Sequence, residues 1–215
     1  MTTIKNSPAG VKIAAAVILL TLSVLFMFSL GLLRNPFSSQ IFHGLRMQQP
    51  APEFLLTDLD GRSWQLADLR GQFVYLMFGY LNCEDVCHSQ ALVLSELTRR
   101  LPDEQLRFVY VAIDPQRDTP QRLKQYFADS LDRVLILNHP NPSYLQSLAN
   151  AYKAPYAVNG QRTGDYLIQH AGFVFLIDPH GDMALLYPGQ LVDLQWLADD
   201  FADIKKILIR GNDNV

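Results

Sequence analysis

Two kinds of apolar pattern alternate along the central part of the chain. Continuous apolar runs at Phe73–Phe78 and Leu106–Ile113 predict strands that are buried on both faces. Between them, from Val86 to about Leu101, apolar residues recur at helical spacing and predict an amphipathic helix. Strands that alternate with helices are typical of an α/β fold, in which helices cover both faces of one sheet.

The same analysis extends to the flanking segments. A β-hairpin is expected around Asp60-Gly61, between Phe54–Leu56 and Ser63–Leu66. Asp118 is interpreted as a helix N-cap, because Thr119-Pro120 follow it and proline suits the first helical position. Further helices are predicted from Asp118 to about Leu131, from Pro142 to Tyr152 and from Trp196 to Ile209, and further strands over Val134–Leu137, Gly172–Ile177 and Met183–Tyr187.

The N-terminal region contains a long uncharged run. Ile13–Leu33 spans 21 residues without a charge, about 32 Å of helix, which is enough to cross a bilayer core. A signal peptide is the alternative, but its apolar region is usually about 7–15 residues long. Since Leu32-Leu33-Arg34 is a poor cleavage site and no cysteine follows for a lipoprotein anchor, we predict an uncleaved transmembrane helix.

This anchor divides the chain into four parts. Residues 1–12 form a short cytoplasmic N-terminus, 13–33 the single-pass inner-membrane anchor, 34–52 a tether with several prolines, and 53–215 a globular domain on the periplasmic side. The Lys/Arg asymmetry around the anchor is slight. The orientation is therefore predicted mainly from the large domain that follows the anchor.

Composition narrows the possible functions. The 215 residues carry a net charge of −3, which offers no basic footprint for a nucleic-acid partner. Two cysteines in the whole chain are too few for a disulfide scaffold.

Those two cysteines, Cys83 and Cys87, lie four residues apart at the junction of a predicted strand and helix. Residues at i and i+4 share a helix face with Cβ atoms about 5–6 Å apart, so their sulfurs can bind one soft metal ion or form a disulfide. The alternative is a pair of small buried hydrophobic residues. Because the junction falls at the carboxyl edge of the sheet, where α/β folds bind ligands, we expect a functional site.

Three motifs resemble the Sco/SenC family, the membrane-anchored thioredoxin-fold proteins of cytochrome oxidase assembly. They are Gly79-Tyr80-x-x-Cys83-x-Asp85-Val86-Cys87, the strand and loop from Val111 to Pro120, and His170 eleven residues before Gly181. The resemblance covers about residues 50–205. It implies a thioredoxin-like fold, in which a central mixed sheet is flanked by helices and preceded by the β-hairpin.

The resemblance also implies a copper site, with Cys83, Cys87 and His170 as ligands of Cu(I) or Cu(II). Two thiolates and an imidazole suit copper, whereas a closed zinc site needs a fourth ligand. Asp114 is expected either to orient a ligand or to cap a loop. His43, His139 and His180 lie in predicted tether or turn segments and are expected to be solvated, and Arg117 is expected to be a docking charge or solvated.

The chain departs from the family pattern beside both cysteines. The family usually has proline directly after each cysteine, and here Glu84 and His88 stand there. Glu84 and Asp85 should disfavour the thiolates, and the helix N-terminus should favour them. His88 is either a surrogate ligand or a solvated helical residue.

Three functions remain in contention. The first is a metallochaperone that delivers copper to the CuA subunit of cytochrome c oxidase or to another exported copper protein. The second is a thiol–disulfide oxidoreductase acting through Cys83 and Cys87, although general dithiol oxidoreductases use Cys-x-x-Cys. A peroxidase is disfavoured, since Leu81-Asn82 do not supply the threonine or serine that a peroxidatic cysteine needs.

Overall fold

The computed structural model describes residues 16–27, 41–83, 86–101, 104–160, 166–189 and 192–212, and only the backbone of residues 86, 87 and 210–212. The chain divides into two units, residues 1–41 and 42–215. In the first unit, residues 16–27 form a helix whose large apolar side chains are exposed. In the part of the chain that the structure describes, no helix is both long and apolar enough to span a bilayer. The predicted anchor, 13–33, extends outside the described residues at both of its ends.

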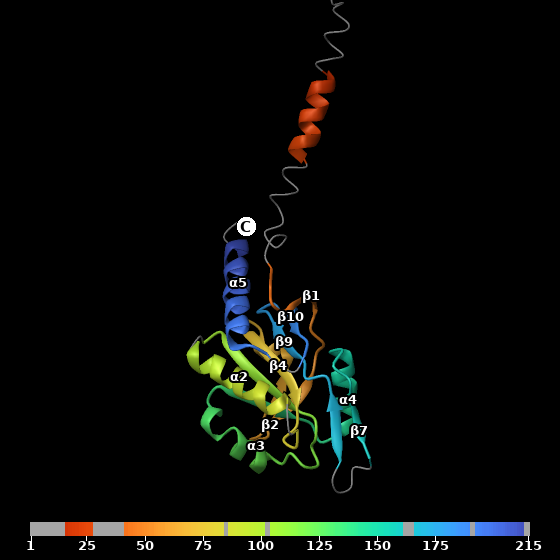
Figure 1. The fold of residues 1–215 in the computed structure, drawn as a ribbon, viewed down its shortest axis with the longest axis vertical. Coiled ribbons are helices and arrows are strands. Elements are labelled where there is room, and N and C mark those ends of the chain that lie inside the picture. The colour runs from red at the N-terminus through yellow and green to blue at the C-terminus, as the bar shows by residue number, and fades with distance from the viewer. Residues whose placement is uncertain are drawn as a thin grey trace, which may run out of the picture. The chain divides into compact units, whose positions relative to one another are not determined.

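In the second unit, the described strands form one mixed eight-stranded sheet and a separate two-stranded sheet (Figure 1). The order in the large sheet is β1-β10-β9-β4-β5-β6-β2-β3, and β7 pairs with β8. The strands are β1 (Leu45–Pro50), β2 (Leu55–Asp58), β3 (Ser63–Gln65), β4 (Phe73–Gly79), β5 (Leu106–Ala112), β6 (Val134–Asn138), β7 (Tyr156–Asn159), β8 (Leu167–His170), β9 (Val174–Ile177) and β10 (Asp182–Tyr187).

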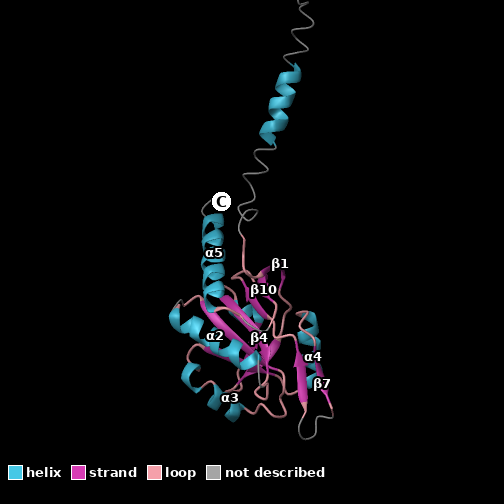
Figure 2. Ribbon diagram, viewed as in Figure 1, coloured by secondary structure: helices cyan, strands magenta, loops and turns pink. Residues whose placement is uncertain are grey.

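Helices cover both faces of the large sheet (Figure 2). They are α2 (Val86–Arg100), α3 (Pro120–Tyr126), α4 (Pro142–Ala151) and α5 (Leu194–Asn212), with short 3-10 helices at Leu66–Leu69 and Ala128–Ser130. On one face, the Tyr75 hydroxyl donates to the carbonyl of Leu197 in α5. On the other face, Phe78 packs edge-on against Tyr152, which directly follows α4. Tyr75 and Phe78, an odd number of positions apart in β4, therefore pack on opposite faces of the sheet, as the apolar run predicts.

The predicted α/β architecture is confirmed. The run at 73–78 forms β4, all of whose residues are buried, and β5 lies parallel beside it. The hairpin around Asp60-Gly61 is also confirmed, since β2 and β3 pair antiparallel and Gly61 has a positive φ of 87°. The helix predicted from Asp118 to Leu131 is shorter than expected, because α3 ends at Tyr126 and a 3-10 turn follows.

The N-terminal boundary of the domain differs from the prediction. We expected 34–52 to be a tether, but β1 lies inside this segment and pairs with β10. Just before β1, the backbone N–H groups of His43 and Gly44 donate to the buried carboxylate of Asp200 at 3.1 and 2.9 Å. The folded unit therefore begins at residue 42, before the predicted start at residue 53.

Two further strands, β7 and β8, were not predicted. His170 ends β8 and lies outside the strand predicted over 172–177. That strand, β9, starts at Val174, after a short turn.

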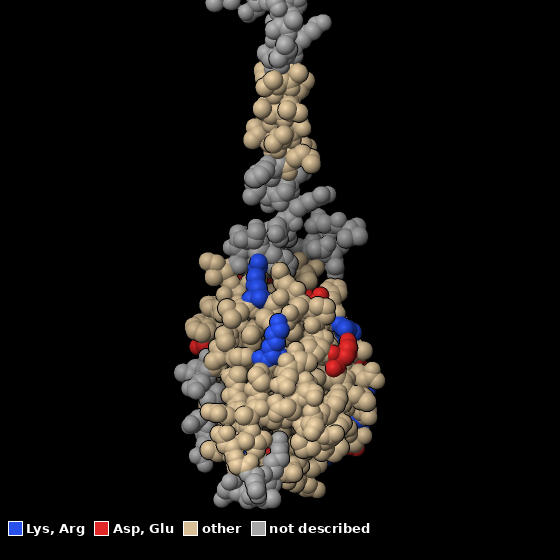
Figure 3. Space-filling model, turned by 90° about the vertical axis from the view of Figure 1, so that its right-hand side faces the viewer, with Lys and Arg blue, Asp and Glu red and all other residues tan. Residues whose placement is uncertain are grey.

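The face of the domain on the side of α4 shows few charged side chains (Figure 3). The sequence of α4, PSYLQSLANA, contains none. Polar, uncharged residues such as Ser143, Ser147 and Asn150 are exposed on this helix.

The parallel strands β4 and β5 end together, with Gly79 paired to Ala112. Glycine is needed at this end of β4, because a Cβ atom at Gly79 would lie 2.7 Å from the Tyr110 ring. The chain leaves the two strands here through residues 80–83 and 113–119, which approach each other at the carboxyl edge of the sheet, where the N–H of Leu81 donates to Asp118.

Candidate metal centre

The first cysteine lies in a tight turn that follows β4. The N–H of Cys83 donates to the carbonyl of Tyr80 at 3.3 Å. Cys83 is half-buried, and α2 begins three residues later. Cys87 lies in the first turn of α2, and its side chain is outside the described atoms, as are Glu84 and Asp85 altogether.

The structure brings His170 to this turn. Its Nε2 lies 3.7 Å from Sγ of Cys83, although 87 residues separate them in sequence. Its Nδ1 accepts the N–H of Gly172 at 3.2 Å, and its ring packs edge-on against Tyr80, with centroids 5.8 Å apart. With Nδ1 accepting, the neutral ring carries its proton on Nε2, the nitrogen that faces the sulfur.

The role predicted for Asp118 is wrong. Thr119 is the N-cap of α3, since its side chain accepts the N–H of Arg122, and Pro120 occupies the first helical position. Asp118 is buried, and both of its carboxylate oxygens lie 3.1–3.2 Å from the N–H of Leu81, two residues before Cys83. Burial raises the pKa of Asp118 to about 7. Asp118 therefore supports the cysteine turn.

Two more side chains hold the same turn. Arg122 donates to Oδ1 of Asn82 at 3.1 Å and to the carbonyl of Arg117 at 2.7 Å. The Nε2 atom of His88 lies 2.9 Å from the carbonyl oxygen of Leu81, and its ring packs edge-on against Tyr126. Because this nitrogen contacts the Leu81 carbonyl, His88 stabilises the turn in the described structure. It is therefore not the solvated helical residue of our alternative interpretation.

The loop after β5 also connects to the strand that carries His170. Asp114 is fully buried and forms an ion pair with Arg117, with Oδ2 and Nε 2.5 Å apart. It also accepts the hydroxyl of Tyr166. Arg117 in turn donates to the carbonyl of Tyr166 at 2.8 Å and lies 3.5 Å from the centre of its ring. Arg117 is thus largely buried, which corrects its prediction as a docking or solvated charge.

Tyr166 immediately precedes β8, so this ion pair anchors the start of the strand that ends at His170. Asp114 is thus linked through Tyr166 to the start of β8, and its pair with Arg117 closes the loop that begins at the end of β5; its role in orienting a ligand stays a prediction. The sequence did not identify Tyr166 or Arg122 as part of the centre, because nothing in their local pattern marks them.

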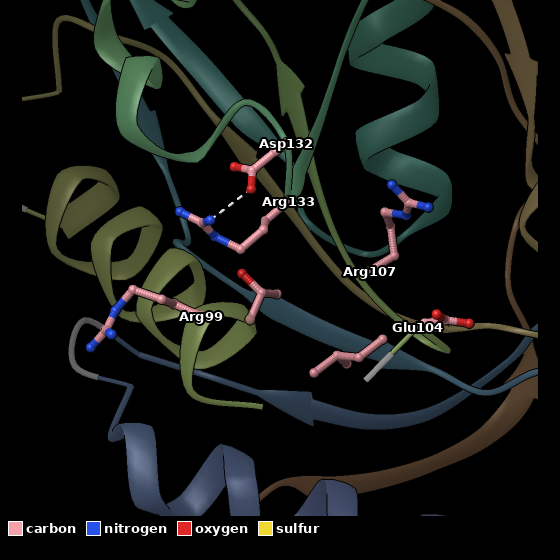
Figure 4. A pocket seen from close by; sticks show the side chains of 7 residues that line it. Arg99, Glu104, Arg107, Asp132 and Arg133 are labelled. Carbon is pink, nitrogen blue, oxygen red and sulfur yellow. Dashed lines mark hydrogen bonds and ion pairs between the residues drawn. The ribbon is translucent and has the colours of Figure 1, made fainter. Parts of the chain in front are cut away.

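The largest of the clefts described lies elsewhere. It has a volume of about 420 Å³ and is lined by Thr98, Arg99, Glu104, Leu106, Arg107, Asp132 and Arg133. Leu106 and Arg107 begin β5, so this cleft lies at the edge of the sheet opposite the cysteine turn. Arg133 pairs with Asp132, and Arg99 and Arg107 lie on opposite sides of this pair (Figure 4). The arginines therefore do not converge on one anion.

Of the three predicted metal ligands, the structure brings Cys83 and His170 together and places the backbone of Cys87 in the first turn of α2. Among the described side chains, no group of three or more from His, Cys, Asp and Glu forms a metal site. The complete ligand set stays a prediction, since the Cys87 side chain is not described. The donors that are present, a thiol and an imidazole nitrogen, are those that copper prefers.

Comparison with known proteins identifies the family. A family model described as SCO1/SenC matches residues 44–205. A protein of Stutzerimonas stutzeri, provisionally named as a copper-binding protein, is 31% identical over 142 residues, or 65% of this chain and 69% of that protein. The mitochondrial protein SCO2 of Saccharomyces cerevisiae is 31% identical over 133 residues, which cover 60% of this chain and 44% of the yeast protein. The chain thus matches less than half the length of that yeast relative.

A solved structure supports the same assignment. BsSco, described as a member of the Sco family of cytochrome c oxidase assembly proteins with a disulfide switch, is 25% identical and superposes with a TM-score of 0.61 over 78% of this chain and 96% of BsSco. The mixed sheet flanked by helices matches this thioredoxin-like fold. The cysteine turn, the loop after β5 and His170 all lie within the matched region. This chain belongs to the SCO1/SenC family.

Proposed function

We propose that this protein binds copper through Cys83, Cys87 and His170 and delivers it to the CuA site of cytochrome c oxidase, or of another exported copper protein, during assembly. The observation that carries the proposal is the approach of His170 Nε2 to Cys83 Sγ at 3.7 Å, with a second cysteine four residues further on. Sulfur and imidazole ligands favour copper. The name of the Stutzerimonas stutzeri relative and the assembly role of the Sco family support the cargo and the partner.

The position in the cell is part of the proposal. Residues 13–33 anchor the chain in the inner membrane, residues 1–12 remain in the cytoplasm, and the copper-binding domain lies in the periplasm. Intact-mass measurement of the protein extracted from membranes tests this arrangement. A mature chain that begins after Leu33 would contradict the anchor.

The second candidate is a thiol–disulfide oxidoreductase that reduces the cysteines of its partner. Its support is the disulfide switch described for BsSco and the spacing of Cys83 and Cys87, which permits a disulfide. The two candidates are compatible as stages of one process, because only reduced cysteines can bind the metal.

Copper titration of the full-length, detergent-solubilised protein tests the first candidate. We expect one copper ion per chain in the reduced protein. Loss of a partner that only supports a ligand typically costs 10–100-fold in metal affinity, so Cys83→Ser, which removes a ligand itself, should cost more than about 100-fold. His170→Ala should weaken binding and alter the Cu(II) spectrum. His180→Ala, at an exposed turn position, is the matched control and should bind copper like the wild type. Equal affinities for all four proteins would refute the site.

A further inference from the structure

Gln90 is a buried amide beside the candidate metal centre. It lies in α2, three residues after Cys87, and is 1% exposed. Its Nε2 donates to the carbonyl of Gly172 at 2.5 Å and to the carbonyl of Gly189 at 3.0 Å. Both partners are loop residues, so this one side chain connects α2 to the turn before β9 and to the segment after β10.

The carbonyl oxygen of the same amide lowers the stability of the fold. The Oε1 atom of Gln90 is buried and has no hydrogen-bond partner among the residues that the structure describes. A buried acceptor without a partner destabilises the native state, whereas an apolar side chain of the same shape avoids that penalty. An arrangement that breaks a packing rule in this way is expected mainly at functional sites.

The contacts of Gly172 show what Gln90 positions. The N–H of Gly172 donates to Nδ1 of His170, and its carbonyl accepts from Gln90. Gly172 has a positive φ of 61°, which glycine adopts without a steric penalty. The orientation of the His170 ring thus depends on Gly172, and the position of Gly172 depends on a side chain from the helix that carries Cys87.

We propose that Gln90 is a positioning residue of the metal centre: it holds the 170–172 turn against α2, so that His170 keeps its ring orientation and its Nε2 faces Cys83. The effect of Gln90 on copper binding rests on the proposed function. The effect of Gln90 on the orientation of the His170 ring is independent of that function, because it exists in the protein without metal.

The test compares Gln90→Met with Thr98→Val in the full-length protein. Methionine keeps the length of the side chain and removes both the donors and the orphan acceptor. Thr98→Val is the matched control, since it removes one buried hydrogen bond, to Ser95 at 2.9 Å, from the same helix two turns further on. Three quantities are measured. The first is the NMR signals of the His170 ring nitrogens in the protein without metal, which the His170→Ala variant assigns. The second is the copper affinity together with the Cu(II) spectrum, and the third is the urea midpoint of unfolding.

For Gln90→Met we expect the ring nitrogens to report a mixture of the two tautomers, where the wild type shows a single Nε2–H form. Copper binding through Nε2 requires the Nδ1–H tautomer of the ring, so a change in the tautomer mixture should change both the copper affinity and the Cu(II) spectrum. The urea midpoint should fall somewhat, because the carbonyls of Gly172 and Gly189 lose their donor while only one orphan acceptor is removed. Thr98→Val should leave the ring signals and copper affinity unchanged.

Unchanged ring signals and copper affinity in Gln90→Met, with a lowered urea midpoint, would mean that Gln90 only stabilises the fold, and would overturn the proposal. If Gln90→Met does not fold, Gln90→Leu replaces it, because leucine has no group that can donate to the Gly172 carbonyl, and the ring signals must change in that variant. A wild type that binds no copper, while Gln90→Met still alters the ring signals, would refute the proposed function and leave the positioning role of Gln90 intact.

Discussion

Asp118 and Leu81 join two loops that are 37 residues apart in sequence: both carboxylate oxygens of Asp118 lie 3.1–3.2 Å from the backbone N–H of Leu81. Leu81 belongs to the turn that ends at Cys83, and Asp118 belongs to the loop after β5. The Asp-Thr-Pro sequence at 118–120 thus has two roles. Thr119 and Pro120 start α3, and Asp118 supports the cysteine turn.

We predict that Asp118 makes stability fall as pH rises from about 4 to about 7. Burial raises its folded pKa to about 7, from an ordinary value of 3.8, so within this window the folded state holds a proton that the unfolded chain has lost. In urea unfolding, the free energy of unfolding of Asp118→Asn minus that of the wild type should therefore rise between pH 4 and pH 7, by on the order of 4 kcal/mol. Asp60→Asn, at an exposed surface pair, is the control. A difference that does not vary with pH would show that Asp118 is ionised throughout.

The buried pair of Asp114 and Arg117 predicts a large effect on stability. Arg117→Met leaves the fully buried carboxylate of Asp114 without its cation, and breaking a buried ion pair in this way costs about 3–5 kcal/mol. Arg99→Met breaks a pair with Glu96 that solvent screens, and it should cost much less. Chemical denaturation measures both. Similar losses for the two variants would mean that Arg117 contributes no more than a surface charge.

Asp200 should determine whether the N-terminal edge of the domain is ordered. It is buried and accepts the N–H groups of His43 and Gly44 and the hydroxyl of Tyr187. Asp200→Ala removes the acceptor of all three donors, so we expect a loss of about 3 kcal/mol and faster hydrogen exchange across β1. Asp199→Ala, next to it, loses only an exposed contact with Gln195. If exchange in β1 is equally slow in both variants, pairing with β10 alone holds this strand.

The interior of the fold could be predicted from the sequence, and its edges could not. The run at 73–78 has no polar interruption, which predicted β4 because only a strand covered on both faces buries every side chain. In contrast, β1 has the sequence LRMQQP, in which only Leu45 and Met47 are large apolar residues and neither is buried. This strand is held by its pairing with β10 and by the hydrogen bond from Gly44 to Asp200, which are 156 residues apart in sequence. Such long-range hydrogen bonds leave no local pattern.

The same limit applies to the candidate centre. Cys83 and His170 were identified from motifs, and the structure brings them together. The side chains that support them were assigned wrongly or missed, because Asp118 and Thr119 both suit an N-cap, and only the position of Leu81 distinguishes them. Gln90 looks like an ordinary helical residue in sequence. Its contact with Gly172 links residues 82 positions apart.

The last prediction separates copper delivery from thiol reduction. Cys83 and Cys87 should form an intramolecular disulfide under mild oxidation, since residues four apart at a helix start fall within the Cα separation that a disulfide tolerates. The oxidised protein has no thiolates to offer and should lose copper, and a thiol reductant should restore binding. His170→Ala is the control, because it should weaken copper binding and still form the disulfide, as thiol mass-labelling would show.

In cells that lack the protein, the two functions predict opposite rescues. A copper-delivery protein is bypassed, at least in part, by excess copper in the medium, because copper then reaches the oxidase without a carrier. A reductase is bypassed by an exogenous thiol, because the cysteines of its partner are then reduced without it. The measurement is the amount of assembled, copper-loaded oxidase under each supplement. If the thiol restores the oxidase and copper does not, the principal function is thiol reduction, and the copper bound at Cys83 and His170 is not delivered.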